Sequence, residues 1–174
     1  MDYMFETEHL RIRSFQAEDA QQLFSIHLEE EVKAWIPNES YANMEDARNA
    51  IAFYTRCVCA KRLPYVLAVT LKETGELIGD TGVNQVTGSL KEVEIGYVIC
   101  QKHSHKGYAT ELLSAMTDFV VSNFHIHVLY GRVMRGNLPS IRVLEKNGYI
   151  FIREELDAED DPYGNGMLVY KSER

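Results

Sequence analysis

The stretch Ser104-His105-Lys106-Gly107-Tyr108-Ala109-Thr110-Glu111 lies between an apolar run typical of a strand, residues 94–99, and a run typical of a helix, residues 112–121. A glycine at such a junction lets several backbone N–H groups face outward at the positive end of the helix. A turn of this kind binds phosphate or pyrophosphate. An ordinary helix start shows the same pattern, so this stretch alone leaves both interpretations open.

A second capped helix is predicted further along, after another strand-like run at residues 127–133. Asn137 and Pro139 are helix start signals, and the Asn-Gly pair at 147–148 is a stop signal of the left-handed type. Residues 149–152 then open a new strand. The predicted order is strand, phosphate-type turn, helix, strand, short helix, strand.

These segments together resemble the GNAT N-acetyltransferases, and within them the Rim-type branch of ribosomal-protein N-terminal acetyltransferases. The resemblance covers nearly the whole chain and rests on the order and spacing of its motifs. It implies an α/β fold with a mixed, mostly antiparallel sheet of about seven strands, helices on both faces, and a splay between the fourth and fifth strands. The matching motifs are Glu8-His9-Leu10-Arg11-Ile12-Arg13, Glu18-Asp19-Ala20, Glu94-Ile95-Gly96-Tyr97, Gly107-Tyr108-Ala109-Thr110-Glu111, Asn137-x-x-Ser140 and Glu145-Lys146-x-Gly148-Tyr149.

Periodicity and turn signals predict the remaining elements. Gly96 within a strand indicates a bulge or a close approach of another backbone. The chain shows no repeat, low-complexity tract or linker, so we expect one domain over residues 1–174. The predicted elements are strands at about 5–14, 65–70, 77–83 and 167–170, helices at about 17–30 and 44–62, and a loop at 32–41 that carries the only tryptophan.

The charge balance is acidic, with 18 Lys and Arg against 26 Asp and Glu and a formal net charge of −8. A negative protein disfavours non-specific binding of nucleic acid and attracts cationic substrates such as amines. No apolar run approaches the roughly 20 residues that span a bilayer, and the first residues do not form a signal peptide. We therefore expect no nucleic-acid or membrane partner and a cytoplasmic location.

The three cysteines, Cys57, Cys59 and Cys100, give little support for a metal site. Residues two apart on a helix point to different faces, so the first two are a poor ligand pair. The other Cys and His groupings lack a second ligand pair at closed-site spacing. We therefore predict no metal. These groupings are Cys100-x-x-His103-x-His105 and His125-x-His127.

The resemblance implies acetyl-CoA as co-substrate. Backbone donors of residues 107–110, which are Gly107, Tyr108, Ala109 and Thr110, would bind its pyrophosphate, and Lys106 would add a point charge. The turn departs from the family at Ser104, where glutamine or arginine is usual, and at His105, where a glycine is common. Neither change removes a backbone donor, so we keep His105 among the cofactor-binding residues.

The resemblance also implies that pantetheine pairs like an extra strand in the splay. The backbone N–H of Val98 would then polarise the thioester carbonyl, and Cys100 nearby would help to hold the pantetheine.

Asn137 and Ser140 have two interpretations. Asn137 can simply cap the last helix, with Ser140 in its first turn. By resemblance, Asn137 binds the cofactor arm and Ser140 stabilises the leaving thiolate. Many GNAT enzymes carry a tyrosine that acts as general acid seven residues after this asparagine, but in this chain that position is Leu144. Because the thiol pKa of coenzyme A is near about 8.5, its thiolate leaves tolerably without a dedicated acid.

Glu94 is the predicted catalytic base, at a position where several family members keep a catalytic glutamate. An alkyl ammonium holds its proton to a pH of about 10, so a group must accept that proton before attack. A solvated carboxylate at the strand end is the other interpretation of Glu94. Glu92, His103 and His105 are alternative bases.

The acceptor stays open between a protein N-terminus, such as that of a ribosomal protein, and a small amine. The segment around Trp35, with Ile36, Pro37 and Tyr41, would rim its site together with the acidic loop at 157–161. We expect a monomer or homodimer. The alternative functions are a non-catalytic acyl-CoA-binding sensor, and a nucleotide-phosphate binder, which we discount because no Gly-x-Gly-x-x-Gly or Gly-Lys-Ser/Thr loop is present.

Overall fold

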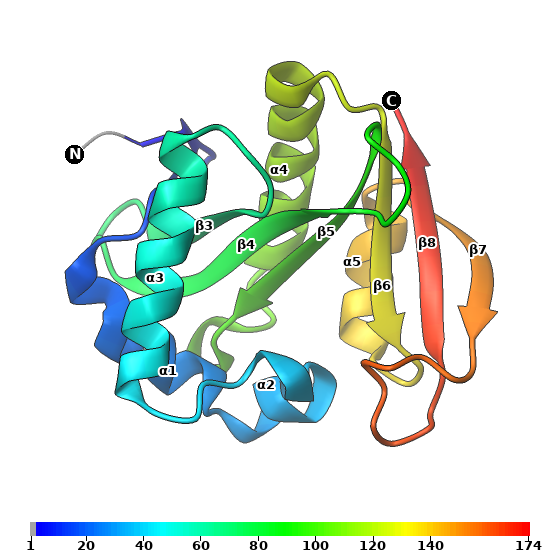
Figure 1. The fold of residues 1–174 in the computed structure, drawn as a ribbon, viewed down its shortest axis with the longest axis horizontal. Helices are drawn as coiled ribbons and strands as arrows, with labels where there is room; N and C mark the ends of the chain where they lie inside the picture. Colours follow the sequence, from blue (N-terminus) through cyan, green and yellow to red (C-terminus); the bar gives the residue numbers. More distant parts are fainter. Residues whose placement is uncertain (1–2) are drawn as a thin grey trace.

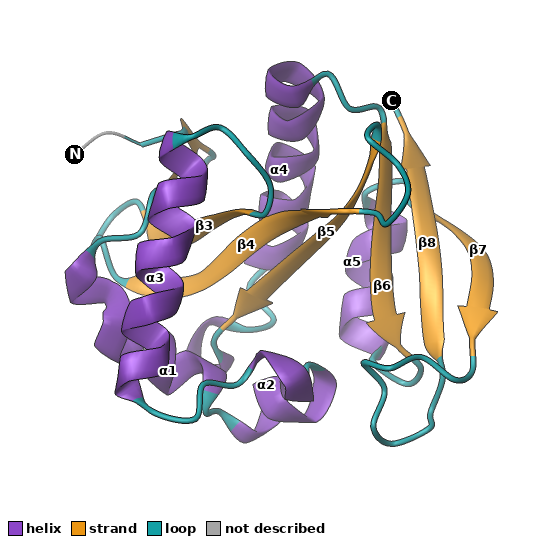
Figure 2. Ribbon diagram, viewed as in Figure 1, coloured by secondary structure: helices purple, strands orange, loops and turns teal. Residues whose placement is uncertain are grey.

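An open sheet of eight strands runs through the molecule in the order β1-β2-β3-β4-β5-β6-β8-β7 (Figures 1 and 2). The structure is a computed structural model that describes residues 3–174. Neighbouring strands are antiparallel, except for the parallel pair β5 and β6. The strands are β1 (Phe5–Glu6), β2 (Leu10–Arg13), β3 (Tyr65–Leu71), β4 (Leu77–Gln85), β5 (Glu92–Ile99), β6 (Val128–Met134), β7 (Ile150–Glu155) and β8 (Met167–Glu173).

Helices cover both faces of this sheet, as predicted (Figure 1). α1 (Ala20–His27) and α3 (Met44–Cys59) pack against β4 and β3, whereas α4 (Tyr108–Phe124) and α5 (Leu138–Lys146) pack against β5 and β6 on the other face. Each helix turns apolar residues inward at helical spacing. In α3 these include the buried Ala47, Ile51 and Val58.

The predicted splay lies between β5 and β6. Their register has only three pairs, Glu92 with Val128, Val93 with Leu129, and Glu94 with Tyr130. Beyond these pairs the two strands diverge toward their C-terminal ends (Figure 1). The register of β4 with β5 is continuous from Gly79–Ile99 to Gln85–Val93, so the bulge considered at Gly96 does not form.

The N-terminal third differs from its predicted elements. The expected strand at 5–14 is a hairpin of two short strands, which raises the strand number from about seven to eight. The expected helix at 17–30 ends at His27, because Glu29 is extended (φ −59°, ψ 134°). The expected loop at 32–41 holds α2 (Glu30–Trp35) and the short 3-10 helix η2 (Pro37–Glu39), where proline favours the first turn.

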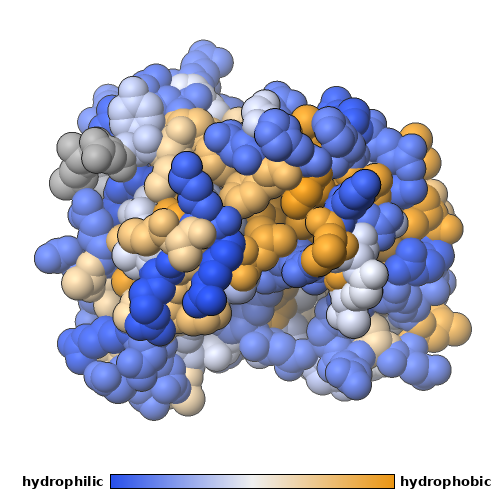
Figure 3. Space-filling view, turned by 45° about the horizontal axis from the view of Figure 1, so that its top comes forward, coloured by the Kyte–Doolittle hydropathy of each residue, from blue (hydrophilic) through white to orange (hydrophobic). Residues whose placement is uncertain are grey.

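Polar residues cover much of the surface, but apolar side chains gather in the middle and toward the right-hand edge of the face in Figure 3. The edge strand β7 exposes three in succession, with Ile150 71%, Phe151 50% and Ile152 42% exposed. Within residues 3–174, no helix is long and apolar enough to cross a membrane. No group of three or more His, Cys, Asp or Glu side chains in the same residues could hold a metal ion.

Candidate active site

A cavity of about 910 Å³ lies at the splay. Its wall is built from β4, β5 and β6, from the α2–η2 segment, and from the starts of α4 and α5. Most of the predicted site residues line it: Glu94, Val98, His105, Gly107, Tyr108, Ala109, Thr110, Asn137 and Ser140. Segments far apart in sequence therefore share one space.

The predicted phosphate turn opens α4. Gly107 is the N-cap residue, with a φ of 86° that favours glycine. The first helical N–H groups, those of Tyr108, Ala109 and Thr110, have no acceptor within a helix and so stay available to a ligand. His105, two residues before Gly107, also has a positive φ, 58°.

Lys106 and Cys100 lie outside the cavity wall. The Lys106 Nζ atom is 3.4 Å from Nδ1 of His103. Cys100 is 3% exposed in the core, and burial raises the pKa of its thiol. The structure thus places both next to the turn rather than in the cavity.

The main-chain groups that face the gap belong to Tyr97 and Ile99 rather than to Val98. The N–H of Cys100 donates to the Ile78 carbonyl on β4 at 2.8 Å. Alternate residues of a strand direct their N–H groups to the same side. In the continuous register of β4 and β5, the N–H of Val98 therefore points into the ladder toward Asp80, and its odd-numbered neighbours point toward β6.

The start of α5 brings two hydroxyl groups together. Asn137 Oδ1 accepts a hydrogen bond from the Ser140 N–H at 3.3 Å, so the capping interpretation of Asn137 is correct as far as its oxygen is concerned. The Ser140 Oγ lies 2.9 Å from the Tyr97 hydroxyl. Burial raises the pKa of Tyr97 to about 12, a shift that the Ser140 bond partly opposes. Leu144, at the family's tyrosine position, is buried against Gly131.

Glu94 is half-buried at the cavity wall. Burial raises the pKa of its carboxyl, the positive charge of Arg132 opposes this rise, and the negative charges of Asp160 and Glu155 add to it. Glu92, the alternative base, lies outside the wall and accepts a hydrogen bond from the Tyr130 hydroxyl at 3.3 Å.

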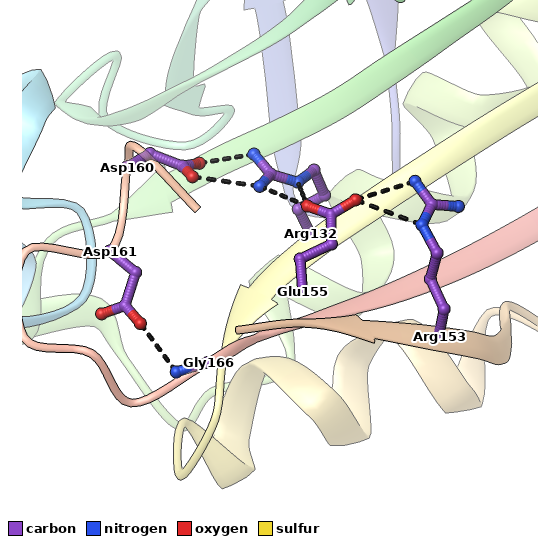
Figure 4. Close-up of polar contacts among 6 residues, drawn as sticks. All are labelled: Arg132, Arg153, Glu155, Asp160, Asp161 and Gly166. Carbon is purple, nitrogen blue, oxygen red and sulfur yellow. Dashed lines mark hydrogen bonds and ion pairs between the residues drawn. The ribbon is translucent and has the colours of Figure 1, made fainter. Parts of the chain in front are cut away.

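Arg132 fixes the acidic loop (Figure 4), and its charge also acts on Glu94. Its guanidinium donates to Glu155 at 2.7 Å and to Asp160 at 3.0 Å, which ties β7 and the loop to β6. In the same loop Asp161 accepts a hydrogen bond from the Gly166 N–H at 2.6 Å. Of the predicted acidic rim at 157–161, the residue that lines the cavity is Asp160.

The end of the cavity near α1 carries a second polar group, which sequence patterns did not reveal. His27 Nε2 lies 2.7 Å from Asp80 Oδ2. Burial alone would lower the pKa of His27, but the charge of Asp80 and its hydrogen bond outweigh burial and raise it. Glu39 and the aromatic residues Trp35, Tyr41, Phe53 and Tyr54 also line the cavity.

A model of the family described as "Acetyltransferase (GNAT) domain" matches residues 9–150. The chain belongs to the GNAT acetyltransferase family. It is thus an N-acetyltransferase by family, as the resemblance implied.

Similar sequences and solved structures support this family assignment. It is 27% identical over 163 residues to the "Uncharacterized N-acetyltransferase p20" of Bacillus licheniformis, covering 94% of this chain and 89% of that one. The fold resembles that of a ribosomal-protein-S5-alanine acetyltransferase from Vibrio fischeri, with a TM-score of 0.84, 17% identity and 97% and 95% of the two chains covered. It also resembles Mycobacterium smegmatis RimJ in complex with CoA-disulfide, with a TM-score of 0.79, 20% identity and coverage of 94% and 81%.

Proposed function

We propose that the protein transfers the acetyl group of acetyl-CoA to a primary amine by direct attack in a ternary complex. One observation carries the proposal: a single cavity reaches the helix start at Gly107, the gap beside β5, the hydroxyl pair of Tyr97 and Ser140, and Glu94. The GNAT family uses acetyl-CoA, which supports the choice of donor.

Main-chain groups do most of the cofactor binding in this proposal. The N–H groups of residues 107–110 would hold the pyrophosphate at the positive end of α4. Tyr97 and Ile99 would pair with the pantetheine arm as with an added strand. An N–H group from the same strand edge polarises the thioester carbonyl as negative charge develops on its oxygen.

Glu94 removes the proton that the amine must lose, directly or through a water molecule. Its raised pKa makes it a better proton acceptor than an exposed carboxylate. The nitrogen forms a C–N bond with the acetyl carbon, and the C–S bond breaks with its electron pair on sulfur. Tyr97, with a pKa of about 12, keeps its proton at neutral pH. Together with Ser140 it therefore donates hydrogen bonds to the leaving thiolate without losing a proton.

The acceptor is either a protein N-terminus or a small amine. The motif resemblance and the fold shared with ribosomal-protein acetyltransferases support assignment to the Rim-type branch. The negative net charge of −8 favours encounter with either kind of cationic acceptor.

A thiol-release assay tests the proposal. The purified protein is mixed with acetyl-CoA and a panel of small amines and short peptides with free N-termini. We expect release above the background hydrolysis with at least one acceptor. A binding module without chemistry would instead be stabilised by coenzyme A and release no thiol with any member of the panel.

A further inference from the structure

Two glycines face each other at the centre of the cavity floor, Gly82 on β4 and Gly96 on β5. A Cβ atom added at Gly96 would meet no heavy atom within 4 Å, whereas one added at Gly82 would lie 3.0 Å from Cγ2 of Val66, which borders the floor on the β3 side. On either side of this glycine pair, Asp80 faces Val98 and Asn84 faces Glu94. All six residues line the cavity. The floor is therefore an open track with one carboxylate toward each end.

Strand geometry sets the length of this track. Glu94 is two residues from Gly96 along β5, within reach of a nitrogen that sits over the glycine. Asp80 is one strand across from Gly96 and two residues along, which is about 8 Å for ordinary strand spacing and rise. An amine that reacts above Gly96 therefore has a second carboxylate about 8 Å away, on the side opposite to Glu94.

The Asp80 end is built to hold a polar group. His27 is 2% exposed and fixes Asp80 through its Nε2 atom at 2.7 Å. Tyr41 packs 5.2 Å from the His27 ring, centre to centre, and Tyr54 lines the same region. Aromatic faces beside a carboxylate attract a cation.

The cavity wall carries more carboxylates than cationic groups, even when the His27 ring beside Asp80 is counted as positive. Its only arginine among the described residues, Arg132, already binds Glu155 and Asp160. Carboxylates crowd this end of the cavity: desolvation and the charge of Asp80 raise the pKa of Glu39, which is exposed, and the charge of His27 opposes the rise. A second positive charge on the acceptor would relieve this crowding. The acidic residues of the wall are Glu29, Glu31, Glu39, Asp80, Glu94 and Asp160.

We infer that the acceptor is a linear aliphatic diamine or polyamine, whose second nitrogen, as an ammonium group, lies at Asp80 while its first, as a neutral amine, is acetylated above Gly96. The inference rests on the proposed acetyl transfer and names its substrate class. An extended chain advances about 1.2 Å per bond, so about seven bonds cover the distance. The compound 1,6-diaminohexane has this length between its nitrogens.

A matched pair of amines tests the inference. The kcat/KM for 1,6-diaminohexane is compared with that for n-hexylamine, which has the same chain and no second nitrogen. We expect the wild-type protein to favour the diamine at least about tenfold, as for a charge-assisted hydrogen bond. Asp80→Asn keeps an acceptor for His27 and should bring the ratio close to one. Glu39→Gln should also lower the ratio of the two kcat/KM values. It provides a second test if a melting experiment shows that Asp80→Asn is unfolded.

Asp118→Asn is the control, because it removes the same charge from an exposed site on α4 outside the cavity. It should leave the ratio unchanged. Equal kcat/KM for the two amines in the wild-type protein would overturn the inference and leave the acetyl transfer intact. Faster acetylation of N-terminal peptides than of the diamine would likewise overturn it. Absence of thiol release with every acceptor would instead reject the proposed function on which it rests.

Discussion

Glu94 and Arg132 illustrate how this chain can tune a single carboxyl group. Withdrawal from water raises the pKa of Glu94, and Arg132 limits the rise because its charge is nearby. Arg132 is in turn shared with Glu155 and Asp160, which weakens its effect on Glu94. The loop that brings in Asp160 thus helps to keep Glu94 able to accept a proton.

Replacing Glu94 by glutamine should reduce turnover at neutral pH by at least about 100-fold, since general-base assistance is typically worth that much or more. Glutamine keeps the shape but cannot take the proton. Affinity for acetyl-CoA should stay nearly unchanged, and the rate should recover as the pH approaches the pKa of the amine. Steady-state kinetics across this pH range measure all three. Near-normal turnover throughout would transfer the base role to another group.

Glu92→Gln is the matched control. Because Glu92 lies outside the cavity wall, this substitution should leave turnover within about threefold of the wild-type value.

The thermal stability of Glu94→Gln gives a second test of the raised pKa of Glu94. The folded state binds the Glu94 proton more tightly than the unfolded chain, whose carboxyl titrates near 4.5. The charged carboxyl therefore costs stability above that pH, and the cost grows until the folded pKa is passed. Glu94→Gln should raise Tm at pH 7, with a smaller gain near pH 4.

The hydroxyl pair calls for a double-mutant cycle. Ser140→Ala alone should lower kcat less than about tenfold, because the neighbouring Tyr97 hydroxyl would still donate to the thiolate in the proposed reaction. Tyr97→Phe should behave similarly. The double variant should lose more than the product of the two single losses, since each hydroxyl substitutes for the other. A loss of several hundredfold in Ser140→Ala, with cofactor affinity intact, would assign the whole effect to the serine.

Sequence motifs singled out Gly107 and Glu94, and both line the cavity. They did not find Tyr97 as the partner of Ser140, because that contact depends on how α5 packs beside the splayed strand. The pairing of His27 with Asp80 spans 53 residues and leaves no local signal. The main-chain groups that face the gap belong to Tyr97 and Ile99 rather than to the predicted Val98. This depends on the register between strands, which the sequence of one strand does not determine.

At the level of single elements, the start of α4 was the most predictable part. A glycine before a helical run can adopt the positive φ that exposes backbone donors, and Gly107 does so. The end of α1 was less predictable, because apolar spacing continues to Leu28 while Glu29 turns extended. Helix ends depend on a few backbone angles that side-chain periodicity does not report.

Coenzyme A should stabilise the protein through this helix start. A ligand at about 100 times its dissociation constant adds about 2.7 kcal/mol to the folded state, which is roughly 5–10 °C in Tm for a chain of this size. Gly107→Asp should abolish most of the shift because it places a carboxylate where the pyrophosphate binds. Gly107→Asn is the control for backbone strain, since asparagine tolerates positive φ and carries no charge. Equal shifts in the wild-type and Gly107→Asp proteins would exclude the turn as the site.

Across the whole molecule, the order of elements together with the family resemblance predicted an α/β fold with a mixed sheet and helices on both faces, and the structure has this fold. Five strands, β1 to β5, form one part of the sheet, and β6, β8 and β7 form the other. Three residue pairs join the two parts. The count of short strands near the N-terminus could not be predicted, because a two-residue strand carries no periodicity.

The short pairing between β5 and β6 affects how well the backbone amides of β5 are protected from hydrogen exchange. The amide hydrogens of Tyr97 and Ile99 face the gap, so in the free protein they should exchange with deuterium much faster than those of Val98 and Cys100, which are bonded to β4. Coenzyme A would supply the missing strand and slow them selectively. Hydrogen–deuterium exchange read at single-residue resolution, with and without coenzyme A, would show this alternating pattern along β5. Uniform protection of both sets in the free protein would contradict it. Under the proposed function, the cofactor would thus take the place of a strand where β5 and β6 diverge.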